Sequence, residues 1–168
     1  MKIFDAKILK ELYANYSDEE LLPVLGFATL EEVQADRAKS DGGFETYDRS
    51  ILGFIMVVKD SNKAIGRCGF HNWYKAHHKS EIGYAIFNEE VRGHGYMSEA
   101  ITATIDYGFK QMNLNRIEAF IVEDNEASKR LLVKNGFVQE GRLRQNWFVN
   151  GEAQNSLMFS LLKEDFKK

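Results

Sequence analysis

The chain has 168 residues, 44% of them hydrophobic, which suits one globular domain over residues 1–168 and excludes wholesale disorder. Its single cysteine, Cys68, excludes a disulfide framework and a zinc site made of several thiolates. The formal net charge of −3 lacks the basic excess typical of nucleic-acid-binding proteins. No signal peptide stands out, nor any apolar run near the ~20 residues of a membrane-spanning helix, so we expect a cytoplasmic protein without nucleic-acid or membrane partners.

The first forty residues predict helices. Asp5 can cap a segment in which apolar and aromatic residues recur at helical spacing, namely Leu9, Leu12, Tyr13 and Tyr16. Residues 17–20 and 29–32 have the pattern of a capping box, in which a hydroxyl accepts from a free backbone N–H and a carboxylate accepts from the N–H of the cap. Each box predicts the start of a further helix.

Two interruptions are expected in this helical region. Pro23 lacks a backbone N–H and is expected to end or redirect the second helix soon after it. The third helix is expected to run to about Lys39, before Asp41, Gly42 and Gly43 break the chain.

The middle of the chain predicts a small meander. Residues 51–59 are rich in β-branched and aromatic side chains, residues 60–62 suit a turn, and residues 64–70 suit a return strand. A third strand is expected at residues 80–87.

The second half predicts helices between strands. A polar loop leads into a helix whose apolar face is Met97, Ile101, Ile105, Phe109 and Met112. A strand at residues 116–122 precedes a second helix, capped by Asn125 and stopped at Asn135-Gly136. Residues 137–148 and 153–162, joined at Asn150-Gly151, suit a terminal hairpin. This order predicts a mixed α/β sheet whose central strands are joined through helices.

The stretch from Phe87 to Ser98 joins a predicted strand to a predicted helix and contains Gly93 and Gly95. Glycine lets the backbone approach an anion closely, and the free amides and dipole of a helix start favour a phosphate there. A tight turn with no ligand explains the same residues. No Gly-Lys-Ser/Thr triplet follows, and Ser98 stands where a dinucleotide-binding loop has its third glycine, so another phosphate-bearing cofactor is favoured.

The segment Arg92-Gly93-His94-Gly95-Tyr96-Met97 resembles the acetyl-CoA signature Arg/Gln-x-x-Gly-x-Gly/Ala of the GNAT N-acetyltransferase superfamily, with Met97 in place of the usual Gly or Ala. Residues 81–84, 95–100, 125–128, 134–137 and 140–141 are similar, in order and spacing, to its RimJ/RimL-like branch. The similarity covers about residues 50–168, and residues 1–4 are the candidate for the family's opening strand. The resemblance implies the GNAT fold, with a central mixed, mostly antiparallel sheet that is splayed at the cofactor site and flanked by helices.

The resemblance also implies which residues bind acetyl-CoA. Backbone groups of residues 85–87 would contact its pantetheine arm, and amides of residues 93–98 would hold its pyrophosphate. The full implied set is Ala85, Ile86, Phe87, Arg92, Gly93, His94, Gly95, Tyr96, Met97, Ser98, Asn125 and Ser128. The acceptor amine would enter from the opposite side of the sheet.

Acetyl transfer to an amine requires a base, because amines are mostly protonated at neutral pH, and a donor to the departing thiolate. Glu81, on the strand leading into the loop, is the candidate base; the alternative is a carboxylate that faces solvent or pairs with a lysine. Ser128 is the candidate donor, and helix capping after Asn125 is the alternative. A backbone N–H on the splayed strand would stabilise the oxyanion.

Other residues leave their roles open. Trp73 and Tyr74 can line the acceptor pocket or pack in a core or interface. Cys68 is expected in the core. The four histidines lack metal-ligand spacing, and no metal is expected. The basic residues either face the ribose phosphate or form a solvated surface; they are Lys129, Arg130, Lys134, Arg142 and Arg144.

These features predict a single-domain enzyme that moves acetyl from acetyl-CoA to a primary amine by direct attack, without an acyl-enzyme. By resemblance, the acceptor is a protein N-terminal α-amino group, ribosomal proteins among them. A small-molecule amine, such as a polyamine, an amino acid or an antibiotic, is one alternative, and a non-catalytic acyl-CoA-binding module is another. The oligomeric state, monomer or homodimer, stays open.

Overall fold

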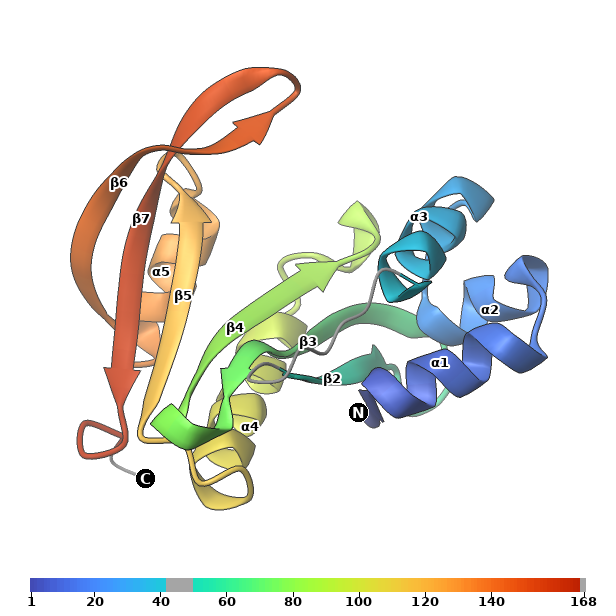
Figure 1. Ribbon diagram of the computed structural model, residues 1–168, viewed down its shortest axis with the longest axis horizontal. Coiled ribbons are helices and arrows are strands. Elements are labelled where there is room, and N and C mark those ends of the chain that lie inside the picture. Colours follow the sequence, from blue (N-terminus) through green and yellow to red (C-terminus); the bar gives the residue numbers. More distant parts are fainter. Residues whose placement is uncertain (42–49, 167–168) are drawn as a thin grey trace.

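The computed structural model describes residues 1–41 and 50–166 (Figure 1). The strands are β1 (Lys2–Asp5), β2 (Ser50–Val57), β3 (Ala64–Tyr74), β4 (Lys79–Ile86), β5 (Arg116–Val122), β6 (Val138–Val149) and β7 (Glu152–Leu162). The α-helices are α1 (Ala6–Asn15), α2 (Asp18–Leu25), α3 (Leu30–Asp41), α4 (Tyr96–Lys110) and α5 (Glu126–Lys134), with 3-10 turns η1 (Lys75–His77) and η2 (Glu89–Val91). Gly42 and Gly43, predicted to break the chain, lie outside the described residues.

The strands form one sheet in the order β1-β2-β3-β4-β5-β7-β6. Among the described strands, β4 and β5 alone pair in parallel, and α4 makes the crossover that a parallel pair requires. All other described pairs are antiparallel. The predicted mixed, mostly antiparallel sheet is therefore confirmed, and β1 confirms the opening strand expected at residues 1–4.

The sheet splays between β4 and β5. These strands pair only where Lys79, Ser80 and Glu81 lie beside residues 116–118, and beyond that point they separate (Figure 1). β5 instead pairs with β7 over its whole length. The β4 edge beyond Glu81 therefore has no neighbouring strand on that side, which leaves backbone groups available for another partner.

The N-terminal helices begin at the predicted caps. The Asp5 carboxylate accepts from the Ile8 amide at 2.8 Å, and Ser17 and Glu20 form a reciprocal capping box. The second helix ends soon after Pro23, as predicted: α2 continues for two more residues to Leu25 and stops at Gly26, whose φ of +74° is left-handed. The N–H that Pro23 lacks would serve a single carbonyl one turn earlier, and packing of the buried α2 residues maintains the remaining turns.

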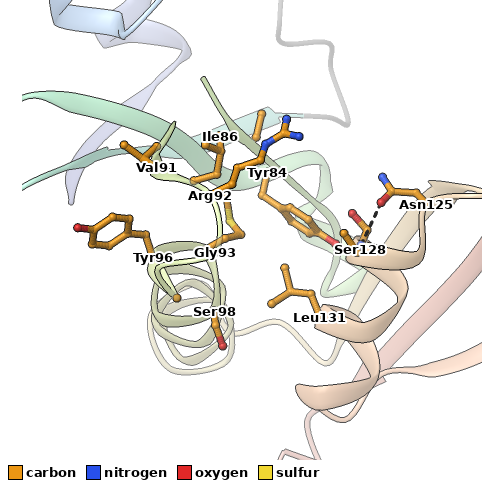
Figure 2. A pocket seen from close by; sticks show the side chains of 14 residues that line it. Tyr84, Ile86, Val91, Arg92, Gly93, Tyr96, Ser98, Asn125, Ser128 and Leu131 are labelled. Carbon is orange, nitrogen blue, oxygen red and sulfur yellow. Dashed lines mark hydrogen bonds between the residues drawn. The ribbon is translucent and has the colours of Figure 1, made fainter. Parts of the chain in front are cut away.

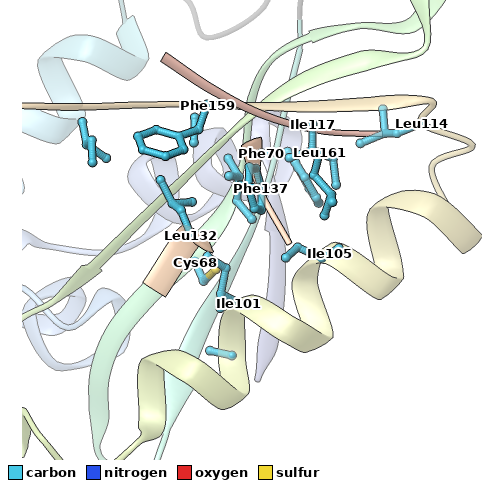
Figure 3. Close-up of a cluster of buried hydrophobic side chains, with 14 of the residues drawn as sticks. Cys68, Phe70, Ile101, Ile105, Leu114, Ile117, Leu132, Phe137, Phe159 and Leu161 are labelled. Carbon is cyan, nitrogen blue, oxygen red and sulfur yellow. The ribbon is translucent and has the colours of Figure 1, made fainter. Parts of the chain in front are cut away.

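Two buried clusters lie on the two faces of the sheet. The larger one packs α4 and α5 against the central strands and includes Cys68, Phe70, Ile101, Ile105, Ile117, Leu132 and Phe159 (Figure 3). Phe70 approaches α4 so closely that a Cβ on Gly108 would lie 2.6 Å from its ring. The smaller cluster packs α1, α2 and α3 against β2 and includes Leu9, Tyr13, Leu21, Leu25, Val33 and Ile55.

Side chains alternate between these faces along β4. Ser80 and Ile82 are buried on the α4 side, so Glu81, Gly83 and Ala85 point to the side of α1 and α3. Within the described ranges, no helix is long and apolar enough to cross a membrane.

Candidate functional site

The loop between β4 and α4 adopts the conformation that its two glycines permit. Gly93 has a φ of +79° and Gly95 a φ of +82°, a region that residues with a side chain rarely occupy. A Cβ at either position would meet nothing within 4 Å. Glycine is therefore required by the backbone angles, and the space beside the loop is open.

The start of α4 is a suitable anion site. Gly95 is the N-cap and has no side chain to satisfy the first amides of the helix. The N–H groups of Tyr96, Met97 and Ser98 lie in the first turn, where an α-helix offers no carbonyl partners and carries the positive end of its dipole. Lys134 adds a positive charge nearby, with Nζ 3.2 Å from Ser98 Oγ.

This helix start borders a first cleft of about 590 Å³ between β4, the loop, α4 and α5 (Figure 2). The cleft brings together most of the residues predicted to bind the cofactor, namely Ala85, Ile86, Arg92, Gly93, Gly95, Tyr96, Met97, Ser98, Asn125 and Ser128. Tyr84, Val91, Ala127 and Leu131 also line it, although the sequence analysis did not select them. Arg92 pairs with Glu89 at 2.6 Å on the exposed rim.

Phe87 and His94, predicted to bind the cofactor, do not line this cleft. The Phe87 amide donates to the Ile65 carbonyl at 3.1 Å, and its ring packs against Gly26 on the other side of the strand. His94 is exposed and its ring lies 5.9 Å from that of Tyr96. Strand alternation sends Phe87 away from the cleft, while the left-handed bends at the flanking glycines turn His94 outward.

Ser128 and Tyr84 face each other where the first cleft meets the sheet (Figure 2). Asn125 caps α5 as predicted, its Oδ1 accepting from the Ser128 amide at 3.0 Å, so capping uses the Ser128 backbone rather than its hydroxyl. The Tyr84 hydroxyl is buried beside Ser128 without a well-formed hydrogen bond in the described structure. Burial raises the pKa of Tyr84, and the nearby Ser128 hydroxyl offsets part of that rise. Two hydroxyl donors therefore meet at one point.

A second cleft of about 520 Å³ lies between α1, α3 and strands β1 to β4. Its lining residues are Phe4, Leu9, Asp36, Lys39, Ile51, Gly53, Arg67, Cys68, Gly69, Phe70, His71, Gly83, Tyr84 and Ala85. Tyr84 and Ala85 line both clefts. The two clefts thus meet at one place on β4, within the splayed part of the sheet.

Glu81 lines neither of these clefts. His71 Nε2 lies 2.9 Å from one Glu81 oxygen, and Asn72 donates to the other at 3.0 Å, so its partner is a histidine rather than a lysine. Burial would raise the pKa of Glu81, but the bonds and charge of His71 together with the Asn72 bond hold it below its ordinary value. His71 does line the second cleft, and sequence reasoning missed it because the two residues are cross-strand neighbours.

Trp73 and Tyr74 are not brought to either cleft. β3 extends past the predicted end at residue 70, so both residues belong to the end of this strand. Trp73 pairs there with Ser50 of β2, and Tyr74 pairs with Lys79 of β4 after a register shift. Lys75 Nζ lies 4.7 Å from the centre of the Trp73 ring, and Lys79 Nζ lies 5.2 Å from that of Tyr74. Their position supports packing at the strand end.

The remaining candidates divide between core and surface. Cys68 is buried as predicted, and burial raises the pKa of its thiol to about 12, which keeps it protonated. Lys129 pairs with Glu126 and Arg142 with Glu123, as a solvated surface predicts. No group of three or more His, Cys, Asp or Glu side chains in the described residues could hold a metal ion.

This arrangement suits transfer of a group between two molecules. A ligand with phosphates can rest on the helix start and extend along the unpaired edge of β4. A second molecule can approach the same edge through the second cleft. The hydroxyls of Tyr84 and Ser128 and the imidazole of His71 are the groups that could move protons where the clefts meet.

Comparisons with known proteins agree with this arrangement. The family model described as "Acetyltransferase (GNAT) domain" matches residues 5–138. A Bacillus subtilis (strain 168) protein described as "Uncharacterized N-acetyltransferase YoaA" is 33% identical over 153 residues, covering 90% of this chain and 86% of that protein.

Two further relatives act on different amines according to their names. Spermidine N(1)-acetyltransferase of Escherichia coli (strain K12) is 28% identical over 120 residues, covering 71% of this chain and 63% of that protein. The crystal structure of ribosomal-protein-S5-alanine acetyltransferase from Vibrio fischeri matches with a TM-score of 0.64 at 27% identity, covering 83% of this chain and 73% of that one.

Proposed function

This chain belongs to the GNAT acetyltransferase family and is an acetyl-transferring enzyme, and we propose that it acetylates the α-amino group of its acceptor by direct attack on acetyl-CoA. Membership of the RimJ/RimL-like branch is part of this proposal. The likeness to the S5-alanine acetyltransferase supports an N-terminal α-amino group, and the likeness to the spermidine enzyme supports a small polyamine as the second candidate.

The residues of the first cleft fit acetyl-CoA. Two glycines with open space beside them, an uncapped helix start and an unpaired strand edge together match a diphosphate followed by an extended amide-bearing arm. In our proposal the amides of residues 93–98 hold the diphosphate, and Ala85 and Ile86 offer backbone groups to the arm. Phe87 is left out of this role because its amide is already paired with Ile65.

Acetyl-CoA supplies a thioester whose carbonyl carbon forms a C–N bond with the amine as the C–S bond breaks, and the sulfur leaves as a thiolate that takes up a proton. The unpaired β4 edge provides backbone N–H groups near this carbonyl, which stabilise negative charge on its oxygen. The amine reaches the carbonyl from the second cleft, at Tyr84 and Ala85.

We assign removal of the amine proton to His71, with Glu81 as the residue that positions it. If Nε2–H is donated to Glu81, the lone pair lies on Nδ1. The Cε1–Nδ1 edge of the ring lies over Gly83, where a Cβ would come within 3.2 Å of Nδ1, and Gly83 precedes the place where the clefts meet. Glu81 then acts through the imidazole, since it does not line the cleft itself.

We assign protonation of the thiolate to the hydroxyl pair of Ser128 and Tyr84. Both line the first cleft, and burial, which raises the pKa of Tyr84, leaves its phenol in the protonated form that can hydrogen-bond to the thiolate. Ser128 keeps the role predicted from the sequence, now with Tyr84 as its partner.

The observation that supports the proposed function most is that Tyr84 and Ala85 line both clefts. The test is to incubate the protein with acetyl-CoA and a panel of amines: peptides with free N-termini, amino acids and polyamines. Free thiol should appear only with an accepted amine, and mass spectrometry should find the α-amino group acetylated. Tight coenzyme A binding without thiol release from any amine would contradict the proposal.

A further inference from the structure

The second cleft contains a guanidinium that its own protein does not fully satisfy. Arg67 lies on β3 directly opposite Ala85, one of the two residues shared by the clefts. Its Nη1 is 3.5 Å from Asp36 Oδ1, a long separation for a charged pair. Its Nε and Nη2 are buried and have no hydrogen-bond partner among the described residues. A buried donor without a partner is costly. The side chain as a whole is 22% exposed and lines the cleft, so a small shift of the guanidinium toward an acceptor supplied by a ligand would be favoured.

Aromatic rings hold this guanidinium in place. The Arg67 Cζ lies 4.0 Å from the centre of the Phe27 ring and 5.7 Å from that of Phe87. Stacking of this kind fixes the plane of the guanidinium, so little side-chain entropy remains to be lost when an anion binds. Phe87, which does not line the first cleft, thus contributes to the second cleft by supporting Arg67.

The other charges of the cleft do not compensate Arg67. Asp36 is the single acidic side chain that lines the described cleft, and its second oxygen accepts from the Tyr13 hydroxyl. Lys39, one turn further along α3, also lines the cleft and has no carboxylate partner among the described residues. Glu81 lies behind His71 and is paired with it. The described lining therefore carries a positive surplus.

A purely structural role is the simpler explanation, since the Arg67–Asp36 pair joins α3 to the sheet. That role accounts for the aspartate, but it leaves two buried guanidinium donors and the neighbouring lysine without partners. It also does not explain why both cations lie in the cleft that leads to the splayed strand.

We infer that the acceptor carries a carboxylate a few bonds from its reactive amine, and that Arg67, assisted by Lys39, binds this carboxylate. The inference rests on the proposed function. Directly opposed side chains on antiparallel strands are about 5 Å apart at Cβ, so a small acceptor can span from Arg67 to the junction at Ala85. The α-carboxylate of a free amino acid or the side chain of an acidic N-terminal residue would supply the same group. A polyamine would instead meet like charges.

The test compares kcat/KM for acceptors that differ in one carboxylate. One pair is L-alanine and L-alaninamide; the other is the peptide amides Glu-Ala-Ala and Gln-Ala-Ala; spermidine is assayed beside them. We expect the acid of at least one pair to be preferred, and the preference to fall by about 10- to 100-fold in Arg67→Met, the range for hydrogen bonds to charged groups. The preference of the wild type is divided by the preference of the variant for the same pair of acceptors, so differences in basicity between the two amines cancel. The pair that responds identifies the source of the carboxylate.

Two further variants keep the result interpretable. Lys39→Met removes an exposed cation without disturbing the core and should reduce the same preference by a smaller factor. Arg142→Met removes an exposed arginine paired with Glu123 outside the cleft and should leave the preference unchanged. Should Arg67→Met fail to fold, Lys39→Met decides.

The inference would be overturned if a folded Arg67→Met protein kept the wild-type preference for the acid. If Arg67→Met does not fold, the same result in Lys39→Met would overturn it. A preference of the wild type for spermidine would overturn it as well. If neutral amines are acetylated as well as acidic ones, the inference fails while the proposed function stands. If no amine at all releases thiol, the proposed function itself fails.

Discussion

The two clefts that meet on β4 are built by different means. The first comes from one continuous segment, residues 84–98, and a second short segment around α5. Its main binding groups are backbone amides at a helix start. The second cleft takes residues from β1, α1, α3 and three further strands, and the polar groups of its described lining are side chains, three of them charged: Asp36, Lys39 and Arg67. Binding through backbone groups needs only a local conformation, whereas binding through side chains needs a complete tertiary fold.

This difference has a functional consequence. A backbone-built site is suited to a ligand that is common to a whole family, because it requires glycines and a helix but few particular side chains. A side-chain site can change its charge by single substitutions while the fold stays intact. Among the relatives, the spermidine and S5-alanine acetyltransferases are named for different amines, while both transfer an acetyl group.

The junction between the clefts should show the largest effect. Tyr84→Phe removes the buried hydroxyl beside Ser128 but keeps the ring, so we expect kcat to fall by about 100-fold, the lower range for loss of a proton donor, with KM for acetyl-CoA nearly unchanged. Steady-state kinetics with both substrates varied measures this. Ser128→Ala is the companion variant. A wild-type kcat in Tyr84→Phe would remove the phenol from the mechanism.

A charge placed in the backbone-built cleft should separate stability from binding. Ser98→Glu adds an acid in the first turn of α4, which favours the helix but repels a diphosphate. We expect KM for acetyl-CoA to rise about tenfold or more while the melting temperature stays the same or rises. Gln34→Glu, an exposed acid on α3, is the matched control. An unaffected KM would place the diphosphate away from the helix start.

The positioning role of Glu81 should give a smaller effect. Glu81→Gln keeps the shape but removes the negative charge beside His71, so we expect kcat to fall about fivefold, as for one ordinary hydrogen bond, with acetyl-CoA affinity intact. If the kinetic constants of Glu81→Gln equal those of wild type at every pH, Glu81 neither acts as the base nor positions His71.

An ion pair outside both clefts should alter stability alone. Glu140 accepts two hydrogen bonds from Arg116, at 2.6 and 2.9 Å, and these, with the Ser160 bond, lower its pKa to about 2. The stabilisation is complete above the ordinary value of 4.5 and is lost as pH falls toward 2. Glu140→Gln should therefore cost up to about 1 kcal/mol at pH 7, since the pair is near the surface, and less at pH 3.

Urea unfolding at both pH values measures this difference, and the kinetic constants of Glu140→Gln should match those of wild type. A change in KM for acetyl-CoA or for the amine would contradict the prediction, because it would show that an ion pair outside both clefts affects substrate binding.

Local signals predicted much of this protein. β5 has the predicted bounds, the caps at Asp5, Ser17 and Asn125 form as expected, and the Gly93–Gly95 loop lies at the helix start. Each of these depends on hydrogen bonds or backbone angles within a few residues, so the sequence contains the whole cause. Pro23 belongs with these local signals, since α2 ends two residues after it.

Contacts between distant residues decided the rest. Glu81 faces His71 rather than a lysine, Trp73 and Tyr74 end up away from both clefts, and Arg67 meets Asp36 on another element. Which side chains line the second cleft depends on strand register, on the alternation of faces along β3 and β4, and on where α3 packs. The sequence by itself thus determined the glycine-bearing loop at the start of α4 and the family, while the tertiary structure alone assembled the second cleft, because its charges come together only after the sheet has formed.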